Sequence, residues 1–155
     1  MQCFSCLKTM DIKGMTLIEV VIIVAIIATL AGIAAVPYRG YVEKARMVKI
    51  IQEIRHIERN LELYKEFNNE YPASLDMLGV VPLDPWDIPY QYTRVAGAKV
   101  GELRKDHNLV PVNTDYDLYS MGADGKSKPP FTAKPSHDDI VRANNGEFIG
   151  LVSDY

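Results

Sequence analysis

The sequence has little cysteine. Of its 155 residues only Cys3 and Cys6 are cysteines, and both precede a long apolar run. A Cys-x-x-Cys pair can bind metal or act in redox chemistry, but this one has no second pair and no nearby histidine. Because no cysteine follows residue 14, no disulfide staples the rest of the chain, and other interactions must hold its loops.

The sequence also lacks an excess of positive charge and any recognisable catalytic motif. The formal net charge is −3, which argues against the basic face typical of nucleic-acid-binding proteins. There is no Gly-x-Ser-x-Gly, no His-Glu-x-x-His and no phosphate-binding loop. The histidines His56, His107 and His137 are far apart in the sequence and adjoin no motif. We therefore expect neither a nucleic-acid partner nor an enzyme.

What the sequence does have is one long apolar run. Residues 20–36 contain no charged side chain and a single hydroxyl group, that of Thr29. With Met15–Ile18 added, the run reaches about 22 residues, enough for a helix to cross the ~30 Å core of a bilayer. The rest of the chain is mixed in polarity, as in a soluble domain. The sequence predicts one membrane span followed by one domain.

One carboxylate, Glu19, lies near the start of this run. Its presence helps to decide among three interpretations of the run. The run is a plain membrane anchor, a signal peptide with its exit around residues 32–34, or a span retained after cleavage between Gly14 and Met15. An ionised acid near the bilayer centre costs roughly 2.5–3.5 kcal/mol, so it usually has a partner or a function. Only the third interpretation provides one, because cleavage gives Met15 a free amine. Pairing of Glu19 with Met15 of the next copy is heterologous and builds a helical filament.

The string Lys13-Gly14-Met15-Thr16-Leu17-Ile18-Glu19, followed by the apolar run, resembles the class III signal of type IV pilins and type II secretion pseudopilins. The resemblance implies that a prepilin peptidase cleaves between Gly14 and Met15, removes residues 1–14 and N-methylates Met15. It also implies that Glu19 is needed for assembly. Met15 replaces the usual phenylalanine of the family, and Pro37 lies one residue later than usual. The true start is either Met1 or Met10.

Beyond Pro37 the sequence becomes amphipathic. Apolar residues recur at three- and four-residue steps, as on one face of a helix, at Met47, Ile50, Ile51, Ile54, Ile57, Leu61 and Tyr64. We expect one helix over about residues 15–67, a short helix between Ser74 and Gly79, and strands ending at Val95, over 115–120 and over 148–152. This order predicts an α+β fold, and the resemblance implies that it is type IV pilin-like. In that fold a long N-terminal helix, membrane-spanning and then amphipathic, packs on a small antiparallel β-sheet.

Further strings in the domain are similar to the major pseudopilins of type II secretion systems. They are Asp84-Pro85-Trp86, Pro89-Tyr90-Gln91-Tyr92 and Asp117-Leu118-Tyr119-Ser120-Met121-Gly122-Ala123-Asp124-Gly125. The resemblance implies a leader at 1–14, a transmembrane and filament-core helix at 15–38 and its amphipathic continuation at 39–68. A periplasmic domain at 69–155, with a long loop at 121–146, would complete the chain.

The resemblance also implies a function. The chain would be a structural subunit that polymerises from the inner membrane of a Gram-negative bacterium into a periplasmic pseudopilus and drives export of folded proteins across the outer membrane. The implied partners are further copies of the chain, the prepilin peptidase, the inner-membrane assembly platform and the minor pseudopilins. Two alternatives remain open. One is a type IV pilin of an extracellular fibre, and the other is a periplasmic binding protein or enzyme released by signal peptidase.

The loop at 121–146 is polar and proline-rich, and a loop of this length needs something to hold it. Asp124 near its start and Asp138 and Asp139 near its end could close it around one calcium ion, which prefers six to eight oxygen ligands. The resemblance implies calcium, with side-chain ligands from Asp124 and Asp139. It adds backbone carbonyls as ligands, from Met121, Lys126 and Ile140. The alternative is that these acids are simply solvated.

Overall fold

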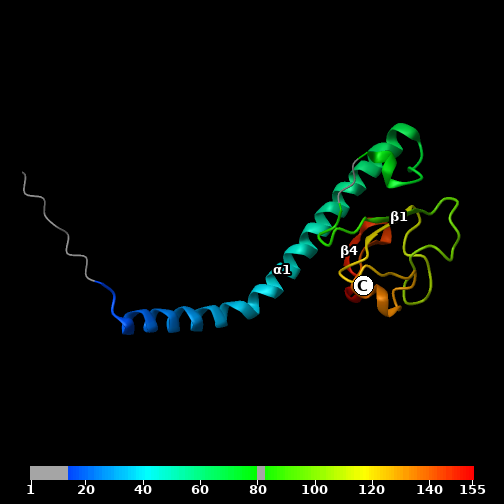
Figure 1. The fold of residues 1–155 in the computed structure, drawn as a ribbon. Helices are drawn as coiled ribbons and strands as arrows, with labels where there is room; N and C mark the ends of the chain where they lie inside the picture. The colour runs from blue at the N-terminus through cyan, green and yellow to red at the C-terminus, as the bar shows by residue number, and fades with distance from the viewer. Residues whose placement is uncertain (1–13, 80–82) are drawn as a thin grey trace, which may run out of the picture. The chain divides into compact units, whose positions relative to one another are not determined.

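The computed structural model describes residues 14–79 and 83–155, so most of the predicted leader, with Cys3 and Cys6, lies outside the described part. The helix α1 (Leu17–Asn68) is followed by the strands β1 (Gln91–Arg94), β2 (Tyr116–Ser120), β3 (Ile140–Ala143) and β4 (Phe148–Leu151), as Figure 1 shows. Short 3-10 helices occupy Leu75–Leu78, Lys134–Ser136, Asn144–Gly146 and Val152–Asp154. By its contacts the chain divides into two compact units, Met1–Tyr41 and Val42–Tyr155.

The ends of α1 agree with the sequence prediction to within one turn. At the C-terminal end, Asn69 adopts a positive φ of 60°, and its N–H donates to the carbonyl of Lys65 at 2.7 Å. Asparagine tolerates this left-handed conformation, which closes the last turn of a helix. The Asn68-Asn69 pair therefore ends the helix for a local, sequence-encoded reason.

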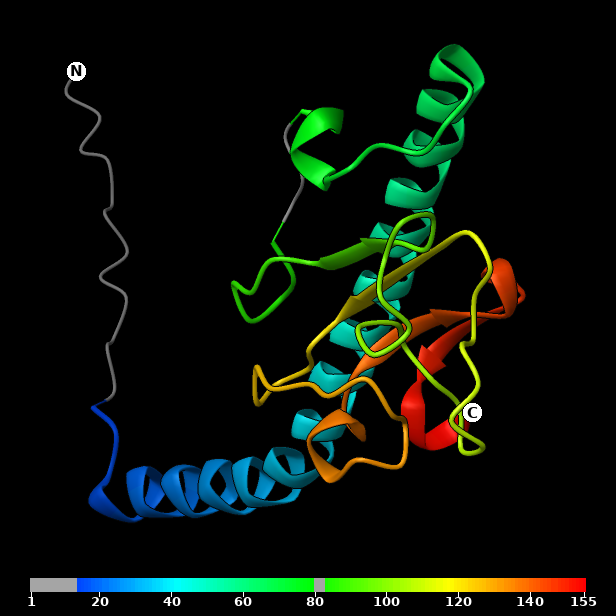
Figure 2. The ribbon, with the colours of Figure 1, turned by 90° about the vertical axis from the view of Figure 1, so that its right-hand side faces the viewer.

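The four strands form one antiparallel sheet in the order β1-β2-β3-β4. In its register Tyr92 faces Leu118 and Tyr119 faces Val141. Figure 2 shows the strands lying across the part of α1 that follows Val42, so one face of the sheet is covered by the helix. The predicted α+β fold, a long helix on a small antiparallel sheet, is confirmed.

The larger core lies between the helix and that face of the sheet. Helix α1 contributes its predicted apolar stripe, and Ile50, Ile54 and Leu61 have no exposed surface. The sheet contributes alternate residues, because side chains at positions two apart point to the same face. These helix and sheet residues form one cluster with Leu75, comprising Ile50, Ile54, Ile57, Leu61, Tyr90, Tyr116, Leu118 and Ile140.

The opposite face of the sheet is covered by loops. Val141 and Ala143 of β3 point to this face and pack with Val112, Phe131 and Val152 in a second, smaller cluster. Phe131 comes from the loop between β2 and β3, and Val112 from the connection between β1 and β2. The domain therefore has three layers, which are the helix, the sheet and a layer of loops.

The sequence prediction missed strand β3. Ile140–Ala143 lies inside the segment 121–146 that was predicted to be loop, and it pairs with strands on both sides. All its residues are buried, including Arg142. A strand of four residues that is covered on both faces shows no alternation of polar and apolar side chains, so its sequence carries no period-2 signal.

We predict that Ile54→Ala lowers the free energy of unfolding by about 2–5 kcal/mol, because it leaves a cavity between α1 and the sheet. Urea unfolding of the full chain in detergent, followed by the fluorescence of Trp86, measures the change. The matched control is Val48→Ala, since Val48 lies on the same helix and is 53% exposed. Equal losses for the two variants would contradict this position of the core.

Candidate functional site

The first candidate site is the start of α1, where the predicted processing and assembly residues lie. Gly14 and Met15 precede the helix and are exposed. The backbone N–H and the hydroxyl of Thr16 donate to Oε2 of Glu19 at 2.8 and 2.9 Å, and the N–H of Glu19 donates to the hydroxyl of Thr16 at 3.3 Å. This reciprocal pattern is a capping box, which satisfies free N–H groups at a helix start. Glu19 therefore has a partner within its own chain.

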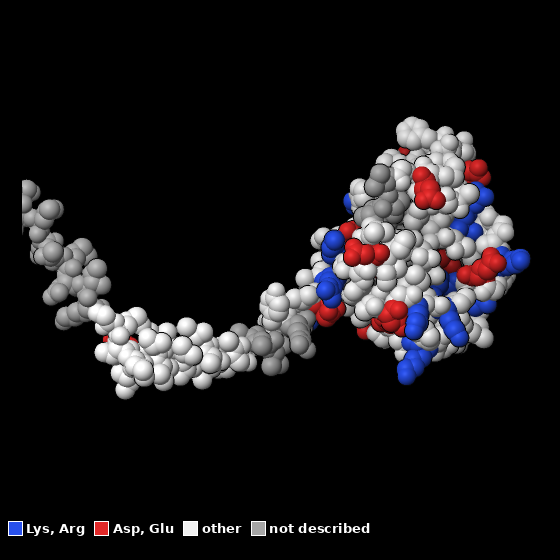
Figure 3. All heavy atoms as spheres, in the orientation of Figure 1, with Lys and Arg blue, Asp and Glu red and all other residues white. Residues whose placement is uncertain are grey.

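The helix beyond this cap exposes an apolar surface. The exposed side chains are Leu17, Ile18, Val20, Val21, Ile22, Ile23, Val24, Ile26, Ile27, Leu30 and Ile33. Figure 3 draws this stretch almost entirely white, whereas acidic and basic side chains are interspersed on the drawn face of Val42–Tyr155. The side chains of residues 34–37 and 39, Pro37 among them, lie outside the described part of the chain. Over residues 14–79 and 83–155, no helix is both long enough and apolar enough to cross a membrane.

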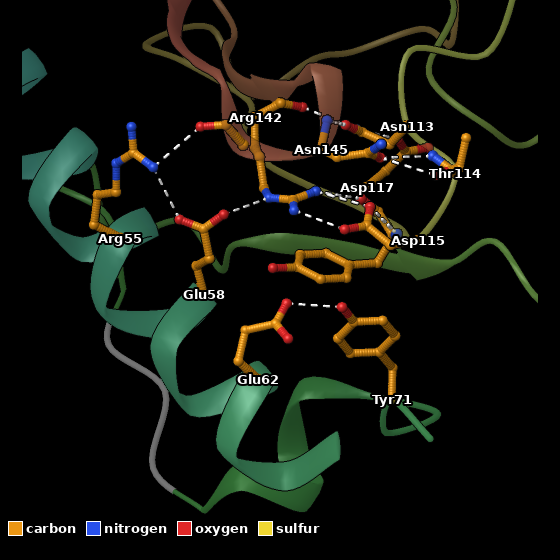
Figure 4. Close-up of polar contacts among 12 residues, drawn as sticks. Arg55, Glu58, Glu62, Tyr71, Asn113, Thr114, Asp115, Asp117, Arg142 and Asn145 are labelled. Atoms are coloured by element: carbon orange, nitrogen blue, oxygen red, sulfur yellow. Dashed lines mark hydrogen bonds and ion pairs between the residues drawn. The ribbon is translucent and has the colours of Figure 1, made fainter. Parts of the chain in front are cut away.

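The second candidate site is a polar network between the sheet and α1 (Figure 4). Its centre is Arg142 of β3, which is only 2% exposed. The guanidinium donates two bonds to Asp115, at 2.7 and 2.9 Å, and one to Oε1 of Glu58 on α1, at 2.9 Å. It also lies over the ring of Tyr116, 4.1 Å from its centroid. The forked geometry of arginine suits such paired bonds to a carboxylate.

Electrostatics in this network favour the charged arginine. Burial lowers the pKa of Arg142, but the hydrogen bonds to Asp115 and Glu58 outweigh it and raise that pKa above its usual value. Nearby, burial and the hydrogen bond to Glu62 raise the pKa of Tyr71, so its hydroxyl stays a donor. The network thus places a charged guanidinium between two carboxylates and a tyrosine hydroxyl against a third.

Gly146 closes this network on the helix side. Its φ is +96°, and a Cβ atom there would lie 2.3 Å from Oε1 of Glu58. Its carbonyl accepts a bond of 3.1 Å from Arg55, which also contacts Glu58. A glycine is therefore required both by the backbone conformation and by the close approach of the helix.

The third candidate site is the loop layer around Asp139. This side chain has no exposed surface, and its Oδ2 accepts bonds from Arg104, at 2.7 Å, and from the hydroxyl of Ser127. Burial raises the pKa of Asp139 to about 6, against Ser127 and Arg104, which both lower it. The carboxylate forms an ion pair with the guanidinium, which lies 2.7 Å away.

The other predicted calcium ligands are spread between surface and core. Asp124 is exposed and its Oδ1 accepts the N–H of Lys126 at 2.8 Å, while its own N–H donates to Asp138 at 3.2 Å. Met121 is half-buried, Lys126 is exposed, and Ile140 is buried in β3. Within 14–79 and 83–155, no three His, Cys, Asp or Glu side chains are grouped so as to hold a metal ion. The carbonyl-rich set predicted from the sequence stays a prediction, and its only buried carboxylate already binds an arginine.

The fold and the N-terminal segment together define a pilin-like subunit, in which a long helix with an exposed apolar start packs its later part on a small antiparallel sheet. No family model matches the chain. It is, however, 31% identical over 136 residues to the type II secretion system core protein G of Pectobacterium carotovorum subsp. carotovorum, with 85% of each chain covered.

Two proteins of the same name show similar agreement. The one from Klebsiella pneumoniae is 29% identical, over 83% of this chain and 91% of its own. The one from Aeromonas hydrophila is also 29% identical, over 87% of this chain and 94% of its own. The chain therefore belongs to the family of type II secretion system core protein G, the major pseudopilins. This membership confirms the pseudopilin among the alternatives that the sequence left open.

Sequence reasoning missed two parts of these sites. The capping box has a local signal, Thr16 followed three residues later by Glu19 ahead of an apolar run, and that pattern could have been found. The roles of Arg142 and Arg104 have no such signal. Their carboxylate partners lie 27 and 84 positions away for Arg142 and 35 positions away for Arg104.

We predict that Arg142→Met lowers the free energy of unfolding by about 3–5 kcal/mol, because it leaves the partly buried carboxylates of Asp115 and Glu58 without their shared cation. Arg55→Met is the matched control. Arg55 contacts the same Glu58, but its side chain is 47% exposed, so its loss should cost less than about 1 kcal/mol. Urea unfolding followed by Trp86 fluorescence distinguishes the two, and a loss at Arg142 no larger than that at Arg55 would refute a structural role for the network.

Proposed function

We propose that this pseudopilin polymerises from the inner membrane into a periplasmic filament through its N-terminal helix. Membership of the core protein G family makes the protein a structural subunit of type II secretion, not an enzyme. The observation that carries the proposal is the start of α1, where a carboxylate lies at the head of an exposed apolar helix. Such a helix is stable when lipid or further helices cover it.

Processing between Gly14 and Met15 is supported by the position of that bond. Both residues lie outside α1, and Met15 is 63% exposed. A peptidase needs an accessible backbone, and the exposure of these residues outside the helix is consistent with that need. Removal of residues 1–14 by a prepilin peptidase and N-methylation of Met15 would leave an amine just ahead of the capping box.

Assembly through Glu19 is supported by its chemistry. In the single chain the carboxylate is satisfied by Thr16, and a carboxylate has further lone pairs to offer. We infer that in the filament Glu19 also accepts the amine of Met15 from a neighbouring copy. This contact joins different surfaces of two identical subunits, so it repeats without closing.

The membrane and domain organisation follows from the same helix. We propose that residues 15–38 span the inner membrane and form the filament core, and that residues 39–68 continue the helix. Residues 69–155 would lie in the periplasm. The boundary between the two compact units, at Tyr41 and Val42, supports a division near residue 38. The proposed partners are further copies of the chain, the inner-membrane assembly platform and the minor pseudopilins.

Calcium is the one predicted component that the described geometry does not favour. Asp139 is buried and bound to Arg104, and Asp124 is exposed and bonded within its own turn. We therefore assign no step of the function to calcium.

The mass of the protein purified from native membranes tests the processing. We expect a chain that begins at Met15 and carries one added methyl group. A chain that retains residues 1–14, or one that begins near Ala35, would exclude the proposed cleavage and with it the free amine.

Two variants separate assembly from helix capping. We predict that Glu19→Ala inserts into the membrane but abolishes filaments seen by electron microscopy, since the neighbour's amine loses its partner. Thr16→Ala removes the cap within the chain and leaves Glu19 in place, at a cost of about 1 kcal/mol of helix stability. We expect this variant to form filaments. If both variants fail equally, Glu19 acts only by capping its own helix.

A further inference from the structure

Arg104 is the buried cation of the loop layer. It lies in the connection between β1 and β2, and its side chain is only 3% exposed. Its backbone N–H donates to Asp117 of β2 at 2.7 Å, and its carbonyl accepts the N–H of Val112 at 3.0 Å. The backbone is therefore fixed to the sheet, and the guanidinium points into the loop between β2 and β3.

The guanidinium joins two parts of that loop, one near its middle and one at its end. On the early side it donates to the hydroxyl of Ser127 and to the carbonyl of Lys128, the latter at 2.7 Å. On the late side it donates to Asp139 at 2.7 Å, and Ser127 donates to the same oxygen. The guanidinium of Arg104 thus binds a hydroxyl, a carbonyl and a carboxylate that all belong to residues 127–139.

Two aromatic rings lie against the guanidinium, and backbone hydrogen bonds of the next residue, Lys105, hold the same loop. The guanidinium lies 4.4 Å from the ring centroid of Tyr119 and 5.2 Å from that of Phe131. Lys105, the next residue, exchanges backbone hydrogen bonds with Pro129 and Phe131, at 3.0 and 2.9 Å. Ser136 holds Lys128 through two bonds of 2.8 Å. The loop is therefore ordered from several sides, with Arg104 at its centre.

A calcium ion does not fit beside this arginine. Calcium needs six to eight oxygens at roughly 2.3–2.6 Å. Among the described residues, Oδ1 of Asp139 has no hydrogen-bond partner, and it is the one atom of that carboxylate still free to bind a cation. A doubly charged ion there would lie next to the buried guanidinium, where repulsion is strong because the dielectric constant is low. Asp124, the other predicted acid, is exposed.

From these contacts we infer that Arg104 takes the role of a loop-closing cation and makes the stability of the loop between β2 and β3, residues 121–139, independent of calcium. The arginine supplies the positive charge that a buried Asp139 requires, and its fork supplies bonds to the loop on both sides. The inference concerns the fold of the subunit alone, so it stands or falls independently of assembly through Glu19.

The wild-type chain provides the first test. Thermal unfolding of the full chain in detergent is followed by circular dichroism with EGTA, with millimolar calcium and with millimolar magnesium. We expect the same Tm in all three buffers. A calcium site saturated at a hundredfold excess over its Kd would raise Tm by about 5–10 °C. A rise of that size with calcium and not with magnesium would overturn the inference, without need of any variant.

Substitution of the pair provides the second test. Arg104→Met should lower Tm by about 6 °C or more, with or without calcium, because it leaves the buried carboxylate of Asp139 without a positive partner. Adding Asp139→Asn to that variant should recover at least about half of the loss, since the stranded charge is removed. The control is Arg59→Met, an exposed arginine of α1, which should leave Tm unchanged. An Arg104→Met chain as stable as the wild type would also overturn the inference.

Limited proteolysis separates loop closure from general stability. Trypsin can cut after Lys126 in this loop, whereas Lys128 and Lys134 are each followed by a proline and resist it. Cleavage there should be faster in Arg104→Met than in Ile54→Ala, when both are compared at temperatures of equal global stability. Ile54→Ala weakens the other face of the sheet and leaves the loop contacts intact. Equal rates in the two variants would show that Arg104 does not close the loop.

Discussion

The domain depends on one buried arginine that joins the sheet to the long helix. Arg142 of β3 binds Asp115 ahead of β2 and Glu58 of α1 from a position that is almost fully buried. Burying a charge is costly unless it is paired and hydrogen-bonded, and here the bonds to two carboxylates meet that condition. Because Glu58 is on the helix, the same bonds that satisfy Arg142 fix how the sheet lies on α1. Gly146 completes the arrangement by leaving room for Glu58.

A second buried arginine, Arg104, fixes the loops to the opposite face of the sheet. Arg104 holds the loop layer by binding Asp139, Ser127 and Lys128. The chain has no cysteine after residue 14, so covalent staples are excluded, and its loops are long and polar. Arginine suits this role because its rigid fork makes several bonds at once and stays charged when buried. The two faces of a thin sheet are thus each fixed by one guanidinium and its carboxylate.

The start of the N-terminal helix is stabilised by a polar contact within the chain. In the single chain Thr16 and Glu19 form a capping box, and the positive end of the helix dipole favours a negative charge at this position. The acid is therefore tolerated before any partner arrives. The proposed contact with a neighbour's amine would add a charge pair to a carboxylate that is already oriented. Membership of the major pseudopilins is consistent with a division between a proposed assembly helix and a domain fixed by its own polar contacts.

The sequence by itself determined the elements whose signals are local. The apolar run indicated the first part of the long helix, the three- and four-residue spacing from Met47 to Tyr64 indicated the face that packs on the sheet, and Asn68-Asn69 indicated the helix end. Only the tertiary structure decided β3, which is too short and too buried to show a period, and the roles of Arg142 and Arg104. Each arginine looks like an ordinary polar residue in the sequence. Its function depends on carboxylates 27 or more positions away, and folding alone brings those charges together.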